Sequence, residues 1–177
     1  DIKERGVEAV SLFCTDGLHG MKEATQETFP LSRFQRCLLH VSRNIAAKVR
    51  VSDRKEILSD FKQVYSGSSL EEAKAHLSIF LEKWKKYQRV LDIFEKNDDL
   101  FTFYEYPLSV RKSIYVSNLI ESYNKKLKRS FKKKEQFPTE TSMEKYLVIE
   151  FEEYNTNAGM KSLKGFRETI RSDWFNE

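Results

Sequence analysis

The segment 118–134 (NLIESYNKKLKRSFKKK) places one carboxylate, Glu121, directly before a dense run of cations. Seven of the ten residues 125–134 are basic: Lys125, Lys126, Lys128, Arg129, Lys132, Lys133 and Lys134. On a helix, several of these cations would share one side with Glu121, while Tyr123, Leu127 and Phe131 could be buried on another. Metal-dependent phosphoryl transfer on DNA needs this layout, because carboxylates hold Mg²⁺ and cations hold the phosphate backbone.

Glu121 also has a purely structural interpretation. Asn118 and Glu121 have the spacing of a capping box, in which Asn118 is the N-cap and Glu121 reaches back to its amide. A helix N-terminus favours an anion for electrostatic reasons as well. Both interpretations of Glu121 remain open at this point.

Asp16 is a second candidate carboxylate. It follows a continuous apolar run, residues 10–14 (VSLFC), which is typical of a short strand buried on both faces. Ligands and metals in α/β proteins are usually bound where such strands end. The alternative is a turn aspartate that caps the next helix.

Cys37 and His40 have the spacing of half a zinc site, and Cys14 with His19 could supply the other half. Cys14, however, belongs to the apolar run, where a thiol usually serves as a small hydrophobic side chain. We therefore expect no structural zinc, and a buried cysteine beside a hydrogen-bonded histidine. Two cysteines are too few for a disulfide framework, which agrees with a reducing compartment.

Charge is unevenly distributed along the chain. The net charge is only +4, from 31 basic and 27 acidic residues, but the stretch 109–134 holds nine cations and Glu121 as its one acid. One face is thus expected to meet a polyanion.

No apolar run approaches the roughly 18 residues of a membrane span, and no signal pattern is present, so we expect an intracellular protein without membrane contact. The chain opens at Asp1 inside a stretch that suggests a helix, residues 1–10, which predicts further sequence upstream.

Periodicity predicts the elements that must position these residues. The first fifty residues suggest strand, helix, strand, helix: 10–14, about 20–28, 34–37, and a helix with His40, Asn44 and Lys48 on its polar side. Two helices with capping boxes, Asp53 with Glu56 and Ser69 with Glu72, should follow, separated by residues 66–68. Their apolar stripes comprise Ile57, Leu58, Phe61, Val64 and Tyr65, then Leu70, Ala73, Leu77, Phe80, Leu81, Trp84, Tyr87, Leu91 and Phe94.

Three further helices are predicted after Pro107: about 119–132, about 141–154 with Thr141 and Glu144 as its capping box, and about 166–174. The predicted organisation is therefore a partial α/β core in 1–50, an all-helical insertion in 51–107, and C-terminal helices in 108–177 that complete the core. The basic helix would span 118–134, and helix should predominate overall.

Four ordered motifs resemble one family. They are FCTDGLHGMKEA, FPLSRFQRCLLHVSRN, VRKSIYVSNLIESYNKKLKR, and Phe137-Pro138 followed by a helix, with the helical insertion between the second and third. Together they are similar to the transposases of bacterial insertion sequences in the Mutator superfamily. The resemblance runs from the first strand to about Glu150.

The resemblance implies an RNase H-like catalytic domain that binds two Mg²⁺ or Mn²⁺ ions with an Asp, Asp, Glu triad. Asp16 would be the second acid, Glu121 the third, and Cys37 with His40 the Cys-x-x-His signature of the family. The first Asp would lie upstream, so the chain alone should be inactive.

It further implies cutting at element ends, joining of the 3′-OH to target DNA, oligomerisation of the full-length protein, and a bacterial cytoplasmic, nucleoid-associated location. Two rival interpretations are a non-catalytic DNA-binding remnant of a truncated transposase and a helical module that binds an acidic protein partner.

Overall fold

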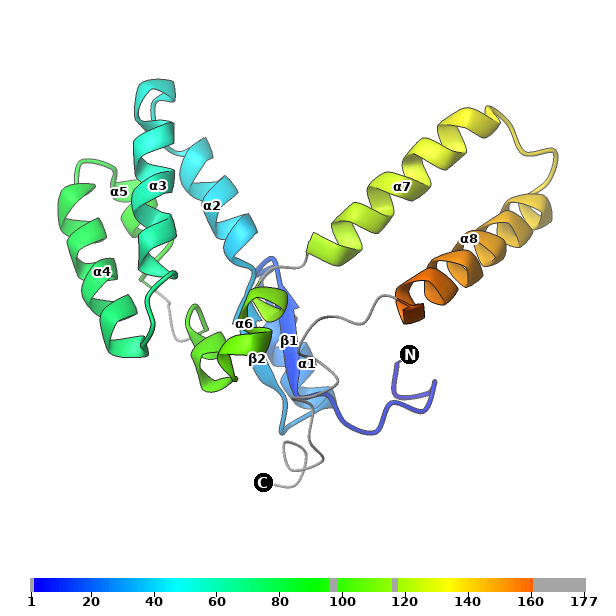
Figure 1. The fold of residues 1–177 in the computed structure, drawn as a ribbon, viewed down its shortest axis with the longest axis horizontal. Coiled ribbons are helices and arrows are strands. Elements are labelled where there is room, and N and C mark those ends of the chain that lie inside the picture. The colour runs from blue at the N-terminus through cyan, green and yellow to red at the C-terminus, as the bar shows by residue number, and fades with distance from the viewer. Residues whose placement is uncertain (1, 96–98, 116–117, 161–177) are drawn as a thin grey trace. The chain divides into compact units, whose positions relative to one another are not determined.

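The computed structural model describes residues 2–95, 99–115 and 118–160. These residues form two compact units, the first ending at residue 115 and the second covering 118–160. The predominance of helix is confirmed (Figure 1). No helix among the described residues is long and apolar enough to cross a membrane. The division at residues 50 and 107 stays a prediction.

The first unit begins with a parallel strand–helix–strand motif. Strand β1 (Leu12–Thr15) pairs with β2 (Arg33–Arg36) so that Cys14 lies opposite Gln35, and α1 (Met21–Thr28) connects them. The prediction that the first strand is buried on both faces is wrong, because all four β1 residues are only half-buried. Among the described residues β1 pairs with β2 alone, which leaves its other edge open. Residues 2–6 form turns rather than a helix, and Gly6 has a φ of 88°.

Helical elements make up the rest of the first unit. They are α2 (Leu38–Ala47), the 3-10 turn η1 (Val51–Asp53), α3 (Arg54–Val64), α4 (Leu70–Lys83), α5 (Gln88–Leu91), η2 (Thr102–Glu105) and α6 (Leu108–Ile114). The long predicted stripe from Leu70 to Phe94 is thus broken after Lys83. Trp84 and Tyr87 donate hydrogen bonds to Asp60 and Asp53, at 2.9 and 2.7 Å. These tertiary bonds hold the chain in a turn at a point where the apolar periodicity alone predicts that the helix continues.

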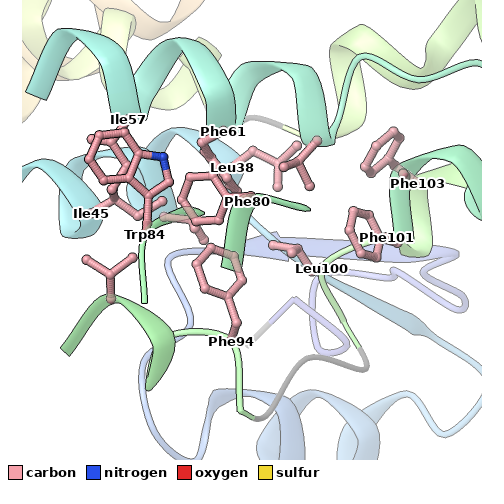
Figure 2. Packing of buried hydrophobic residues seen from close by; sticks show 14 of the residues in the cluster. Leu38, Ile45, Ile57, Phe61, Phe80, Trp84, Phe94, Leu100, Phe101 and Phe103 are labelled. Carbon is pink, nitrogen blue, oxygen red and sulfur yellow. The ribbon is translucent and has the colours of Figure 1, made fainter. Parts of the chain in front are cut away.

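One hydrophobic core joins α2 to the helices that follow it. Ile45 and Ile57 are fully buried, and Phe61 packs against Phe80 and Phe94 with ring centroids 5.8 and 5.7 Å apart. Figure 2 shows these side chains converging from α2, α3 and α4, together with Phe94 and residues 100–103. The aromatic residues of the helical segment are therefore core residues, as their spacing predicts.

The predicted capping boxes had different outcomes. Ser69 accepts a hydrogen bond from the Glu72 amide, and Glu72 accepts one from the Ser68 amide, so this cap is confirmed with a shift of one residue. Asp53 does not cap α3. Its carboxylate accepts hydrogen bonds from Lys86 and Tyr87 instead, each at 2.7 Å, because a cation is a stronger partner than a backbone amide.

Gln35 connects β2 to the far end of the helical segment. Its side chain is fully buried and donates to the carbonyls of Arg36 and Leu100 at 2.7 and 2.9 Å. It also accepts a hydrogen bond from the Phe103 amide at 2.9 Å. One side-chain amide thus satisfies buried backbone groups more than sixty residues apart in sequence.

The second unit consists of α7 (Asn118–Lys134) and α8 (Glu140–Met160) (Figure 1). Tyr123 packs against Phe151 and Tyr154, with ring centroids 5.4 and 4.2 Å apart. The predicted Thr141–Glu144 cap is wrong. Thr139 and Ser142 instead exchange side chain–amide hydrogen bonds at 3.1 and 3.2 Å, because α8 begins at Glu140 and its capping residue therefore lies two residues before Thr141. The helix predicted at 166–174 lies outside the described residues.

Gln35 gives the first testable prediction. Gln35→Leu should lower the free energy of unfolding by about 2–4 kcal/mol, because it leaves two buried backbone groups of residues 100 and 103 without partners. Urea unfolding measures this loss. The matched control is Gln26→Leu on the exposed side of α1, which should change stability by less than about 0.5 kcal/mol. Equal stability of the two variants would contradict the role given to Gln35.

Candidate nucleic-acid interface and carboxylates

Helix α7 separates an apolar face from a basic one. Tyr123 and Leu127 are buried, Tyr123 packs against aromatic residues of α8, and Phe131 packs against Phe137 and Tyr146. The seven predicted cations are all exposed: Lys125, Lys126, Lys128, Arg129, Lys132, Lys133 and Lys134. The amphipathic pattern predicted from sequence is thereby confirmed.

Lys126 differs from the other cations because α8 partly neutralises it. Its ammonium group lies 3.6 Å from Glu150 and 3.8 Å from Glu153. Glu150 also accepts hydrogen bonds from Ser130 and Tyr146, and these bonds lower the pKa of its carboxyl group. This polar cluster holds Lys126 at the edge of the α7–α8 contact.

The other six basic residues of α7 have no carboxylate within 4 Å among the residues that the structure describes. Part of this basic side is hollowed into a shallow groove lined by Ser122, Lys125, Lys126, Arg129, Ser130 and Lys133. Of the four cations that line this groove, Lys126 pairs with carboxylates of α8, whereas Lys125, Arg129 and Lys133 do not. These three cations can attract a polyanion, since no internal carboxylate competes for them.

Glu121 lies in the first turn of α7 and is half-buried. Helical periodicity puts Lys125 and Lys128 one and two turns further along its side of the helix. The predicted capping box with Asn118 cannot be followed into the structure, because the Asn118 side chain lies outside the described part. Both interpretations of Glu121 therefore stay predictions.

Asp16 is exposed and follows the last residue of β1 directly. Its Oδ1 accepts a hydrogen bond from the Leu18 amide at 3.2 Å, and Thr15 Oγ1 accepts one from the Gly17 amide at 3.2 Å. Gly17 has a φ of 81°, and a Cβ there would lie 3.2 Å from Arg36 Nε. The turn is thus held close to β2, and it presents the Asp16 carboxylate at the carboxyl edge of the two strands.

A polar pocket that sequence reasoning missed lies beside this turn. Lys22 of α1 pairs with Asp99 at 2.7 Å, and Arg36 donates to the Ile93 carbonyl at 3.0 Å. Burial lowers the pKa of Arg36, while the nearby Asp99 opposes the shift. Lys22 is near the predicted Asp16 turn in sequence, but no sequence signal pointed to Asp99, which lies 77 residues away.

The predicted signature residues Cys37 and His40 lie at the start of α2. Cys37 is buried at the N-cap position, and its amide donates to the Thr15 carbonyl at 2.6 Å. A hydrogen bond with Cys37 and burial raise the pKa of the Cys14 thiol. The two thiols are therefore neighbours across the β1–α2 junction, and His19 is exposed on the turn that follows Asp16.

The described residues contain no group of three or more His, Cys, Asp or Glu side chains that could together hold a metal ion. Asp16 belongs to the first unit and Glu121 to the second. Their shared metal site stays a prediction.

Comparison with known proteins gives consistent matches over most of the chain. The family model described as transposase, Mutator family, matches residues 1–159. The transposase for insertion sequence element IS905 of Lactococcus lactis is 45% identical over 166 residues, which are 93% of this chain and 42% of that protein. The transposase for IS1201 of Lactobacillus helveticus is 45% identical over 155 residues, which are 86% of this chain and 42% of that protein.

A more distant relative, the probable transposase for an insertion sequence element of Corynebacterium diphtheriae, is 33% identical over 152 residues, or 84% of this chain and 44% of that protein. The chain thus spans less than half the length of these relatives. The family match covers both the Asp16 turn and the basic helix α7. This chain belongs to the Mutator family of transposases.

Proposed function

We propose that this chain is the part of an insertion-sequence transposase that supplies two acids of a DDE-type active site and a helix that holds DNA. In this proposal Asp16 and Glu121 are the second and third acids of an RNase H-like catalytic core. Two observations support the proposal most strongly: the family membership, and the exposed carboxylate of Asp16 at the carboxyl edge of the parallel strands.

The geometry around Asp16 supports this role. β1, α1 and β2 form a parallel strand–helix–strand motif, and the open edge of β1 is where further strands of an RNase H-like sheet would pair. The relatives are more than twice as long as the matched segment, so they have room for such strands. We assign the first acid of the triad to no residue of this chain, and we expect the chain alone to show no strand transfer.

The donor chemistry suits Mg²⁺ or Mn²⁺. Asp16 and Glu121 offer carboxylate oxygens, the ligands that these hard cations prefer, and exposed Asp16 is accessible to an ion. When bound, a pair of such ions activates the attacking water or 3′-OH and stabilises the leaving oxygen. The chain's own acids would hold the ions, and the cations of α7 would hold the strand backbone with little reading of base sequence.

The partners follow from this assignment. The substrates would be element ends and target DNA in the bacterial cell, at the nucleoid, and the full-length protein would act as a homo-oligomer. Cys37 and His40 would shape the active site from the start of α2, close to Thr15 and therefore to Asp16.

A charge variant tests the role of α7. Replacing Lys125, Lys128, Arg129 and Lys132 by Gln should weaken binding to all duplex sequences about equally. The slope of log K against log salt should become shallower by about one for each phosphate that the variant no longer neutralises. Fluorescence anisotropy at several salt concentrations measures both quantities.

The matched control for the α7 variant removes the same charge elsewhere, at exposed Lys3, Lys62, Lys74 and Lys145. The control should bind almost as the parent does, because these lysines lie outside α7. Equal losses of DNA affinity in the α7 variant and in the control would show a non-specific effect of net charge. They would contradict a DNA-binding role for α7.

A chimera tests catalysis. The matched segment of the Lactococcus lactis relative would be replaced by this chain, and excision and strand transfer would be measured. Asp16→Asn and Glu121→Gln should each abolish both steps, because each removes a metal ligand. The control Glu144→Gln, an exposed carboxylate on α8, should remain active. Activity in the Asp16 or Glu121 variant would refute the catalytic assignment, and a remnant that binds DNA without catalysis would then be favoured.

A further inference from the structure

The first unit carries a group of cations that is separate in sequence from α7. Its members are exposed and have no carboxylate partner within 4 Å among the residues described in the structure. They are Lys48, Arg50, Arg54, Lys55 and Arg89, here called the second basic surface.

Tertiary contacts bring these cations to one end of the helical segment. Lys48 follows the last residue of α2, Arg50 precedes η1, Arg54 and Lys55 begin α3, and Arg89 lies in α5. The Arg50 amide donates to Tyr87 Oη at 3.4 Å, and Tyr87 donates to Asp53 at 2.7 Å. These bonds connect the residues around η1 to Tyr87, the residue that precedes α5.

Neighbouring lysines, unlike the five cations of the second basic surface, do have carboxylate partners. Lys83 pairs with Glu56 and Asp60, Lys85 with Glu82, and Lys86 with Asp53. Asp53, Glu56, Asp60 and Glu82 each lie within 4 Å of one of these three lysines. The five cations of the second basic surface have no such partner among the described residues.

Folding does not explain this arrangement. Arg54 and Lys55 lie in the first turn of α3, where the helix macrodipole disfavours cations. Like charges gathered at one end also repel one another. The placement thus costs some stability, which a binding function would explain.

The surface is suited to nucleic acid rather than to a protein partner. The centre of a protein interface is apolar and, although Arg is enriched there, it is depleted of Lys and of acidic residues. In η1, which lies among these cations, Val51 is the one large apolar side chain that is exposed, at 75%. Cations spread over several elements, by contrast, fit a phosphate backbone.

We propose that the second basic surface is a further DNA-binding surface, which holds a stretch of phosphate backbone independently of the basic helix α7. That the polyanion is DNA rests on the proposed function. The transposase would then hold DNA through two parts of this chain, one in each unit.

The test uses the whole chain and a short duplex of random sequence. Arg54→Gln with Lys55→Gln should lower affinity and make the slope of log K against log salt shallower by about two, since each neutralised phosphate accounts for about 0.9 of that slope. The melting temperature should stay the same or rise, because cations leave the first turn of α3. This last readout separates impaired binding from impaired folding.

The matched control is Lys62→Gln with Lys74→Gln, which removes two exposed charges from the last turn of α3 and from α4. It should keep the affinity and the salt slope of the parent. If the Arg54/Lys55 variant behaves as this control does while the α7 variant loses affinity, the second surface is refuted and the proposed function stands. If the parent chain binds no duplex at all, the second basic surface and the proposed function are both refuted.

Discussion

The buried amide of Gln35 is the interaction on which the arrangement of the first unit depends. It holds β2 against residues 100–103, and the neighbouring Arg36 amide donates to the Asp99 carbonyl at 2.9 Å. The carboxyl edge of the strands is thereby fixed against the helical segment. Asp16, the Lys22–Asp99 pair and Arg36 all lie at or beside that edge. A core hydrogen bond thus sets the surroundings of the candidate catalytic acid.

Distribution of charge is the second organising constraint. Several acids of the helical segment pair with lysines, and Glu150 and Glu153 lie within 4 Å of the Lys126 ammonium group. Among the described residues, cations without a carboxylate partner are concentrated on α7 and on the second basic surface, although exposed Lys62, Lys74 and Lys145 lie elsewhere. A protein that must hold a polyanion gains from such segregation, because an internal carboxylate beside each cation would compete with phosphate.

Helical periodicity predicted most of the fold correctly. The stripes of α3 and α4 and the apolar face of α7 are where the spacing of Phe61, Phe80 and Leu127 indicates. Predictions failed where tertiary partners compete with local ones. Asp53 bonds Lys86 rather than capping α3, and Trp84 bonds Asp60 where a continuous helix was expected. Gln35 gave no signal, because a polar residue is buried only when distant partners are present.

The residues of the candidate site differ in how visible they are in the sequence. Asp16 and Glu121 stand beside local patterns, a strand end and a run of cations, so sequence could single them out. The position of Asp99 depends on contacts between segments far apart in the chain, so no local pattern could reveal it. Four of the five cations of the second basic surface lie within residues 48–55, but the place of Arg89 beside them depends on the tertiary bond between Tyr87 and Asp53.

The central claim is that Asp16 and Glu121 bind the same metal site. Its most direct test is the melting temperature of the parent chain, Asp16→Asn, Glu121→Gln and the double variant, each with and without millimolar Mn²⁺. A shared site predicts that Mn²⁺ stabilises the parent, that each single substitution removes most of this shift, and that the double variant loses little more. If Mn²⁺ shifts the melting temperature of all four proteins equally, or of none, the two acids do not share a metal site in this chain and the account is contradicted.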